Sequence, residues 1–95
     1  MKADLETLRK ALKACAQAHN AEFLDWSETV REISIKSESV PTVSDVRMIC
    51  RAFYGTAHMA QTGHGFTTVY LDEGEMLPEV DEMMLQMALP RGTQL

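Results

Sequence analysis

Positively charged side chains are scarce in the second half of this 95-residue sequence, where no lysine or arginine occurs between Arg51 and Arg91. Residues 1–51 contain eight basic and eight acidic side chains, which cancel. Residues 52–95 contain six acids against one arginine, so this half accounts for the whole net charge of −5. Such an asymmetry favours a surface that meets a basic partner over an active site. The six acids are Asp72, Glu73, Glu75, Glu79, Asp81 and Glu82.

Cysteine and long apolar runs are also scarce. The two cysteines, Cys15 and Cys50, fall at positions typical of apolar helix faces, so no disulfide framework is implied. The apolar runs are only a few residues long, far below the roughly 20 that cross a bilayer, and residues 1–4 lack the apolar run of a signal peptide. We therefore expect a cytoplasmic protein without a membrane segment. The composition, 45% hydrophobic and 24% charged, is typical of one globular domain over residues 1–95.

Catalytic and metal-binding signatures are missing too. The sequence contains no phosphate-binding glycine loop, no dinucleotide-binding glycine pattern and no Gly-x-Ser-x-Gly nucleophile turn. Cys15 and His19 lie one helical turn apart and offer two ligands of a zinc site, but no paired Cys-x-x-Cys or His-x-x-x-His signature accompanies them. We therefore expect neither an enzyme nor a bound metal or cofactor.

The first third of the chain has the spacing of helices. Apolar residues at helical intervals predict a first helix from Asp4, a suitable N-cap, to His19, with Asn20 in the left-handed conformation that ends a helix. A second apolar stripe over residues 23–33 predicts another helix, although the alternation at residues 33–36 also fits the start of a strand.

The middle of the chain predicts a helix, a loop and a strand. Thr42 with Asp45 three positions later resembles a capping pair that opens a third helix, and Gly55 suits its end. The glycines at residues 55–65 favour a loop or a frayed helix end. Residues 66–71 are β-branched and aromatic and form the best strand, for which residues 31–37 are the expected partner.

A last helix is predicted between Pro78 and Pro90, with an apolar stripe at Val80, Met83, Met84 and Met87. The expected fold is therefore α+β and predominantly α-helical, with about four helices and at most a small two-stranded sheet. No internal repeat is evident in the sequence.

The methionines and acids of this last segment support two interpretations each. Residues 76–87 contain four methionines. Because apolar helix stripes usually face inward, we expect these methionines in the core, and a partner-binding or dimer interface is the alternative. The acids form either a solvated helix end or a face that engages a basic surface. In the second interpretation the partner-binding residues are Asp72, Glu73, Glu75, Glu79, Glu82, Met83 and Met87.

Residues 29–46 resemble a helix-turn-helix unit, and Arg47 and Arg51 on the helix predicted after Thr42 could contact phosphate. The acidic balance of the chain and the small basic patch argue against direct DNA binding. A DNA-binding transcriptional regulator is therefore the alternative function, and a homodimeric structural adaptor built on the methionine stripe is the second alternative.

In size and composition, the chain resembles the small acidic inhibitors that phages and mobile elements direct against host machinery. The resemblance implies a protein that acts by stoichiometric binding, as an inhibitor or regulator of a host protein or nucleic-acid-binding complex, with anti-defence activity as one example. Its expected partner is the basic surface of a protein or nucleoprotein complex, which the acidic face would occlude.

Overall fold

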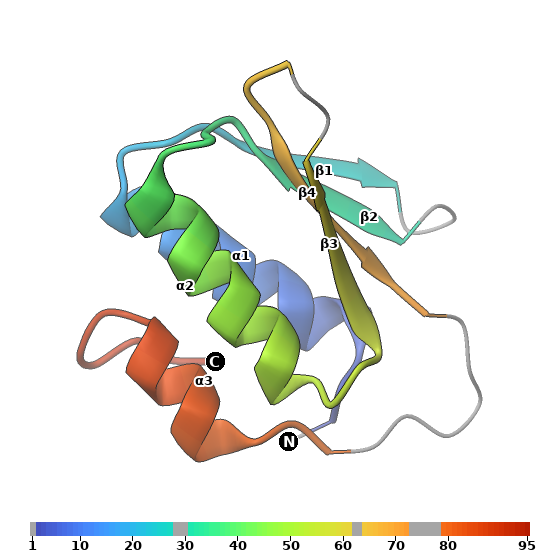
Figure 1. Ribbon diagram of the computed structural model, residues 1–95. Coiled ribbons are helices and arrows are strands. Elements are labelled where there is room, and N and C mark those ends of the chain that lie inside the picture. Colours follow the sequence, from blue (N-terminus) through green and yellow to red (C-terminus); the bar gives the residue numbers. More distant parts are fainter. Residues whose placement is uncertain (1, 28–30, 62–63, 73–78) are drawn as a thin grey trace.

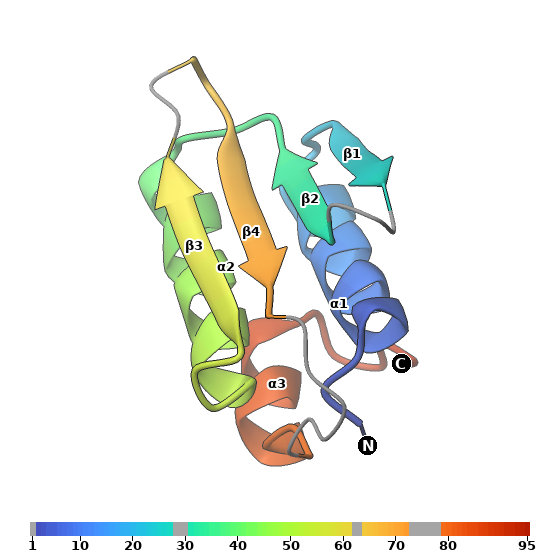
Figure 2. The ribbon, with the colours of Figure 1, turned by 90° about the vertical axis from the view of Figure 1, so that its right-hand side faces the viewer.

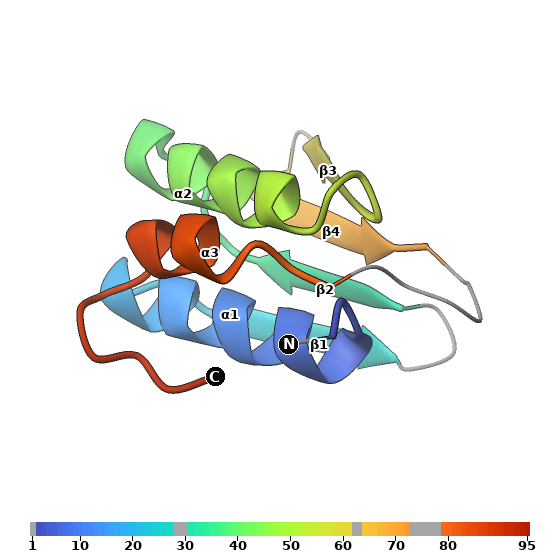
Figure 3. The same cartoon turned by 90° about the horizontal axis from the view of Figure 1, so that it is seen from below.

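The computed structural model of the chain describes residues 2–27, 31–61, 64–72 and 79–95. Over these residues, four strands form one antiparallel sheet in the order β1-β2-β4-β3. Helices α1 and α2 cover one face of the sheet (Figures 1 and 2), and α3 lies between them when the molecule is seen from below (Figure 3). The elements are α1 (Leu5–Ala18), β1 (Phe23–Ser27), β2 (Glu32–Ile35), α2 (Val40–Ala52), β3 (Ala57–Gln61), β4 (Thr67–Leu71) and α3 (Glu82–Ala88).

The prediction of a mainly helical fold with a two-stranded sheet is wrong. The described residues contain three helices and a four-stranded sheet. The error comes from residues 23–33, where helical spacing of apolar side chains suggested a helix but residues 23–27 form β1 and pair with β2. None of the helices in the described ranges has the length and apolar character that a bilayer crossing requires.

The first helix agrees with the sequence prediction, and its ends explain why. The Asp4 carboxylate accepts a hydrogen bond from the Thr7 N–H at 2.9 Å, which satisfies one of the free donors at the helix start. After the last helical residue, Asn20 adopts a φ of 53°, the left-handed conformation expected of it. The predicted helix and its predicted end are confirmed.

The predicted pairing of the best strand is also confirmed. β4 pairs with β2 in antiparallel register, with Ile33 opposite Val69 and Ile35 opposite Thr67. On the other face of the same two strands, the Ser34 and Thr68 hydroxyls lie 2.8 Å apart and are both buried. The central pair of the sheet therefore combines an apolar row facing the helices with a hydrogen-bonded polar pair facing away.

Two further predicted boundaries are wrong. The segment predicted as a loop contains β3, because residues 57–61 pair with β4 although only Ala, His, Met and Gln occur there. Ser39 caps α2 in place of Thr42, since its hydroxyl accepts the Thr42 N–H. Pro41 then falls in the first turn, where its missing N–H is not needed.

The chain contains a structural repeat that the sequence does not reveal. A helix followed by a β-hairpin occurs twice, as α1-β1-β2 and α2-β3-β4, and the strand order places the two hairpins side by side through β2 and β4. Both helices end alike, because Asn20 and Tyr54 lie two residues past their helix and adopt φ values of 53° and 51°. Leu12 and Val46 occupy matching buried positions 34 residues apart.

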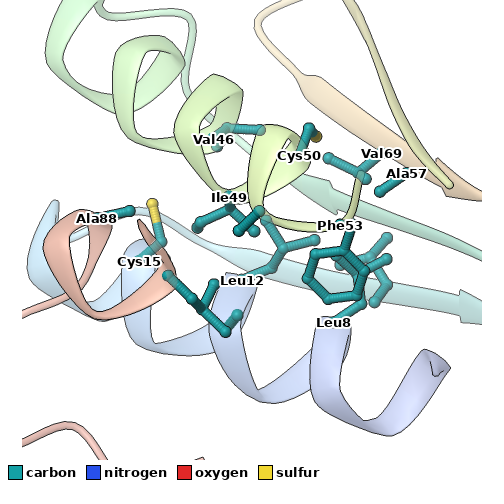
Figure 4. Packing of buried hydrophobic residues seen from close by; sticks show 14 of the residues in the cluster. Leu8, Leu12, Cys15, Val46, Ile49, Cys50, Phe53, Ala57, Val69 and Ala88 are labelled. Atoms are coloured by element: carbon teal, nitrogen blue, oxygen red, sulfur yellow. The ribbon is translucent and has the colours of Figure 1, made fainter. Parts of the chain in front are cut away.

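The core lies between the sheet and the helices. Leu8 and Leu12 from α1, Ile49 from α2, and Phe53 just after α2 are fully buried and pack with Val69 of β4 (Figure 4). Buried residues of all three helices belong to this one cluster. The helices and the sheet are therefore held by a shared apolar interior.

Candidate functional site

The last helix is shorter than predicted and is oriented by its contacts with α2. Its first residue is Glu82, because the Asp81 carboxylate caps the helix by accepting the Met84 N–H at 3.1 Å. The Asp81 N–H donates to the Ala52 carbonyl at 2.8 Å and so attaches the start of α3 to the end of α2. Pro78, the predicted first residue, lies outside the described residues. The helix begins later than predicted, because Glu79 forms an isolated bridge with Lys2 and Val80 precedes the helix.

The buried face of α3 is formed by Leu85 and Ala88, with Leu89 just after the helix. An α-helix turns about 100° per residue, so side chains two positions from Leu85 lie on the opposite face. Met83 and Met87 occupy those positions and are 77% and 73% exposed. The expectation that the methionine stripe fills the core is therefore wrong for these two residues. Met84 is half-buried, and Met76 lies outside the described residues.

A groove of about 270 Å³ runs between α2 and α3, and its lining is mainly methionine. Thioether side chains are flexible and polarizable, so a methionine surface adapts to apolar side chains of different shape. Full burial of one such side chain contributes roughly 1.5–3 kcal/mol, so a partner that covers both exposed methionines would gain binding free energy from them. We call this surface the α2–α3 groove; it is lined by Met48, Arg51, Asp81, Met83, Met84 and Met87.

Charged side chains border the groove. Asp81 lines the groove at the N-terminal end of α3, and the exposed Glu82, the first helical residue, lines an adjoining hollow; the helix dipole favours negative charge there. Arg47 and Arg51 are exposed on α2, and Arg51 lines the groove itself. One acidic residue, Asp81, and one basic residue, Arg51, therefore lie among the methionines of the groove and allow charged contacts around an apolar centre.

The residues predicted to bind a partner do not all lie together. Met83 and Met87 line the groove, and Glu82 joins them along an adjoining shallow hollow on the outer side of α3. Asp72 instead lies beyond the end of β4, and one of its carboxylate oxygens is 2.9 Å from Nε2 of His58. Glu73 and Glu75 lie outside the described residues.

The helix-turn-helix prediction is wrong at its first helix. Residues 32–35, which would end that helix, form β2 in the centre of the sheet, and residues 29 and 30 are outside the described ranges. Arg47 and Arg51 are both exposed on α2, but both line a hollow beside β3, and Arg51 also lines the α2–α3 groove. The geometry that would place α2 as a recognition helix is therefore absent from the described residues.

A second cluster, of side chains that can bind metal ions, lies between α1 and α2. Nε2 of His19, the C-cap of α1, lies 2.7 Å from a carboxylate oxygen of Asp45 on α2, and the buried Cys15 thiol completes the group. Burial raises the pKa of Cys15 to about 12, and the nearby Asp45 charge acts in the same direction. Spacing along the sequence identified Cys15 and His19, but Asp45 is 26 residues from His19 and carried no signal.

Comparison of the chain with protein-family models, with curated proteins and with solved structures finds no match in any of the three. Function is therefore inferred from the geometry of these residues.

Proposed function

We propose that the protein acts by binding another protein stoichiometrically, with the α2–α3 groove as the centre of contact. The observation that carries this proposal is the exposure of Met83 and Met87, at 77% and 73%, on a helix whose opposite face is fully packed. A few well-desolvated apolar contacts usually provide most of the affinity of an interface. These two side chains, with Met48 and Met84 in the groove, supply such contacts.

The partner we propose presents an apolar side chain flanked by lysine or arginine. The apolar side chain enters the groove, and the basic residues pair with the acidic end of α3 at Glu79, Asp81 and Glu82. The net charge of −5, all of it from residues 52–95, supports attraction of a basic protein over long distances. A nucleic-acid-binding protein or nucleoprotein complex fits this description, and occlusion of its basic surface would inhibit or regulate it.

The test has two steps. Affinity capture with the wild-type protein recovers the partner, and the dissociation constant of that partner is then measured for the wild type and each variant. Met83→Ser with Met87→Ser should weaken binding at least tenfold, which corresponds to about 1.4 kcal/mol. Val40→Ser is the matched control, because Val40 is an equally exposed apolar residue at the other end of α2 (81% exposed). Equal affinity of the methionine variant and the wild type would contradict the proposal.

The acidic end is tested separately by charge reversal. Glu79→Lys with Glu82→Lys should weaken binding and reduce its dependence on salt, because rim charges mainly act through long-range attraction. Glu22→Lys with Glu38→Lys changes the net charge equally at exposed positions away from α3 and should change binding less. If both pairs of substitutions weaken binding equally, net charge alone explains the effect and Glu79 and Glu82 do not contact the partner.

A second copy of the chain is the other occupant that the groove would accept. Sedimentation of the purified protein over a range of concentrations distinguishes the two. A dimer that disappears in the Met83→Ser, Met87→Ser variant would replace the proposed partner with a homodimer. A monomer at all concentrations would leave the groove available to a different protein.

A further inference from the structure

We propose that Cys15, His19 and Asp45 form a zinc-binding site that joins α1 to α2. One ligand atom from each side chain lies within 4.8 Å of the other two. The site is separate from the α2–α3 groove and does not rest on the function proposed for it.

The donor set matches the chemistry of zinc. Thiolate, imidazole and carboxylate are the three side-chain ligands that Zn²⁺ takes, at distances of about 2.0–2.3 Å. A tetrahedral arrangement with such bonds separates neighbouring ligand atoms by roughly 3.4–3.6 Å. The His19 and Asp45 atoms, now 2.7 Å apart, would move slightly apart, and the remaining separations of up to 4.8 Å would shorten by about 1 Å. Side-chain rotation alone covers changes of this size.

The charges also balance. Zn²⁺ binding converts the Cys15 thiol to a thiolate, and the proton passes to solvent. The thiolate and the Asp45 carboxylate then carry two negative charges against the two positive charges of the metal, and His19 binds as the neutral imidazole. A neutral cluster is far less costly to bury than a lone thiolate at this position.

The position of the three side chains provides both a closed interior and an access route. Cys15 is 1% exposed and belongs to the core cluster that also contains Ala88 (Figure 4), whereas the side chains of His19 and Asp45 are 21% and 38% exposed. A metal ion can therefore approach through His19 and Asp45 and reach the sulfur last. Within the described residues the cluster holds three protein ligands, so water completes the tetrahedral set.

Cobalt titration of tag-free, metal-stripped, reduced protein is the direct test. Co²⁺ should bind one to one with a sulfur-to-cobalt charge-transfer band and the visible absorption of four-coordinate cobalt, and Zn²⁺ should displace it. Cys15→Ser should abolish the charge-transfer band. Cys50→Ser is the matched control, because Cys50 is the other buried thiol and should leave the band unchanged.

Asp45→Asn and His19→Gln keep the test informative if Cys15→Ser does not fold, since both residues are partly exposed. Loss of a residue that only hydrogen-bonds a metal ligand typically lowers metal affinity about 10–100-fold. Because His19 and Asp45 would bind the metal directly, each substitution should lower the affinity at least as much. Absence of the band in the wild type overturns the proposal. A band that persists in Cys15→Ser, or unchanged affinity in Asp45→Asn, overturns it as well and leaves a simple His19–Asp45 pair.

Discussion

The orientation of α3 can be tested without knowing any partner, by comparing substitutions on its two faces. Leu85 is fully buried, whereas Met87, two positions later, is 73% exposed. Leu85→Ala should lower the free energy of unfolding by about 3–5 kcal/mol, because it removes apolar contacts and leaves a cavity. Met87→Ala should change it by less than about 0.5 kcal/mol, since most of that side chain is already in water and alanine favours the helix slightly.

The measurement is equilibrium unfolding in urea, followed by circular dichroism, for the wild type, Leu85→Ala, Met87→Ala and Met83→Ala. In a domain of this size, about 1 kcal/mol corresponds to a change of roughly 4–8 °C in Tm, so Leu85→Ala should lower Tm by at least about 12 °C. The two methionine variants should unfold within a few degrees of the wild type. If Met87→Ala destabilises the protein as much as Leu85→Ala, α3 is rotated about its axis and the groove proposed for binding does not exist.

Two further predictions concern stability. Burial raises the pKa of both Cys15 and Cys50 to about 12, whereas a thiol in the unfolded chain has a pKa of about 8.5. The unfolded state therefore loses these protons first, so each thiol contributes stability that is complete below about pH 8.5 and is lost as the pH rises towards 12. In urea unfolding of the metal-free protein, the free energy of unfolding should fall by about 1–2 kcal/mol per thiol between pH 8 and pH 10. The fall should be smaller in Cys50→Ala, and an equal fall would contradict the argument. Asp4→Ala removes the cap of α1 and should cost about 1 kcal/mol, seen as a lower Tm, while an unchanged Tm would show that the bond to Thr7 contributes nothing net.

Local chemistry explains which parts of the fold could be predicted. The first helix has a capping aspartate, a regular apolar stripe and an asparagine suited to positive φ, and all three signals agree at Asp4, Leu8 and Asn20. The pairing of residues 32–35 with 67–71 was also predictable, because both segments are rich in β-branched residues. The sequence pattern was sufficient where local preference and tertiary structure coincide.

The remaining errors arise where contacts distant in sequence decide the outcome. β3 has little intrinsic preference for a strand and forms because β4 supplies its hydrogen bonds. On α3, Leu85, Ala88 and Leu89 have helical spacing as good as that of the methionines. Packing against α2 decides which of the two sets is buried. Asp45 joined the metal-ligand cluster only through the packing of α1 on α2.

Residues 36–39 connect the two helix-and-hairpin units, since β2 ends at Ile35 and α2 begins at Val40. In the described residues, the two hairpins are joined by the antiparallel pairing of β2 with β4. The Thr67 hydroxyl donates to the Ser37 carbonyl at 2.7 Å and holds the connector in its folded-back course over β4. This four-residue connector therefore keeps β2 beside β4 at a high effective concentration, so the central pairing of the sheet depends on a short segment that belongs to neither hairpin.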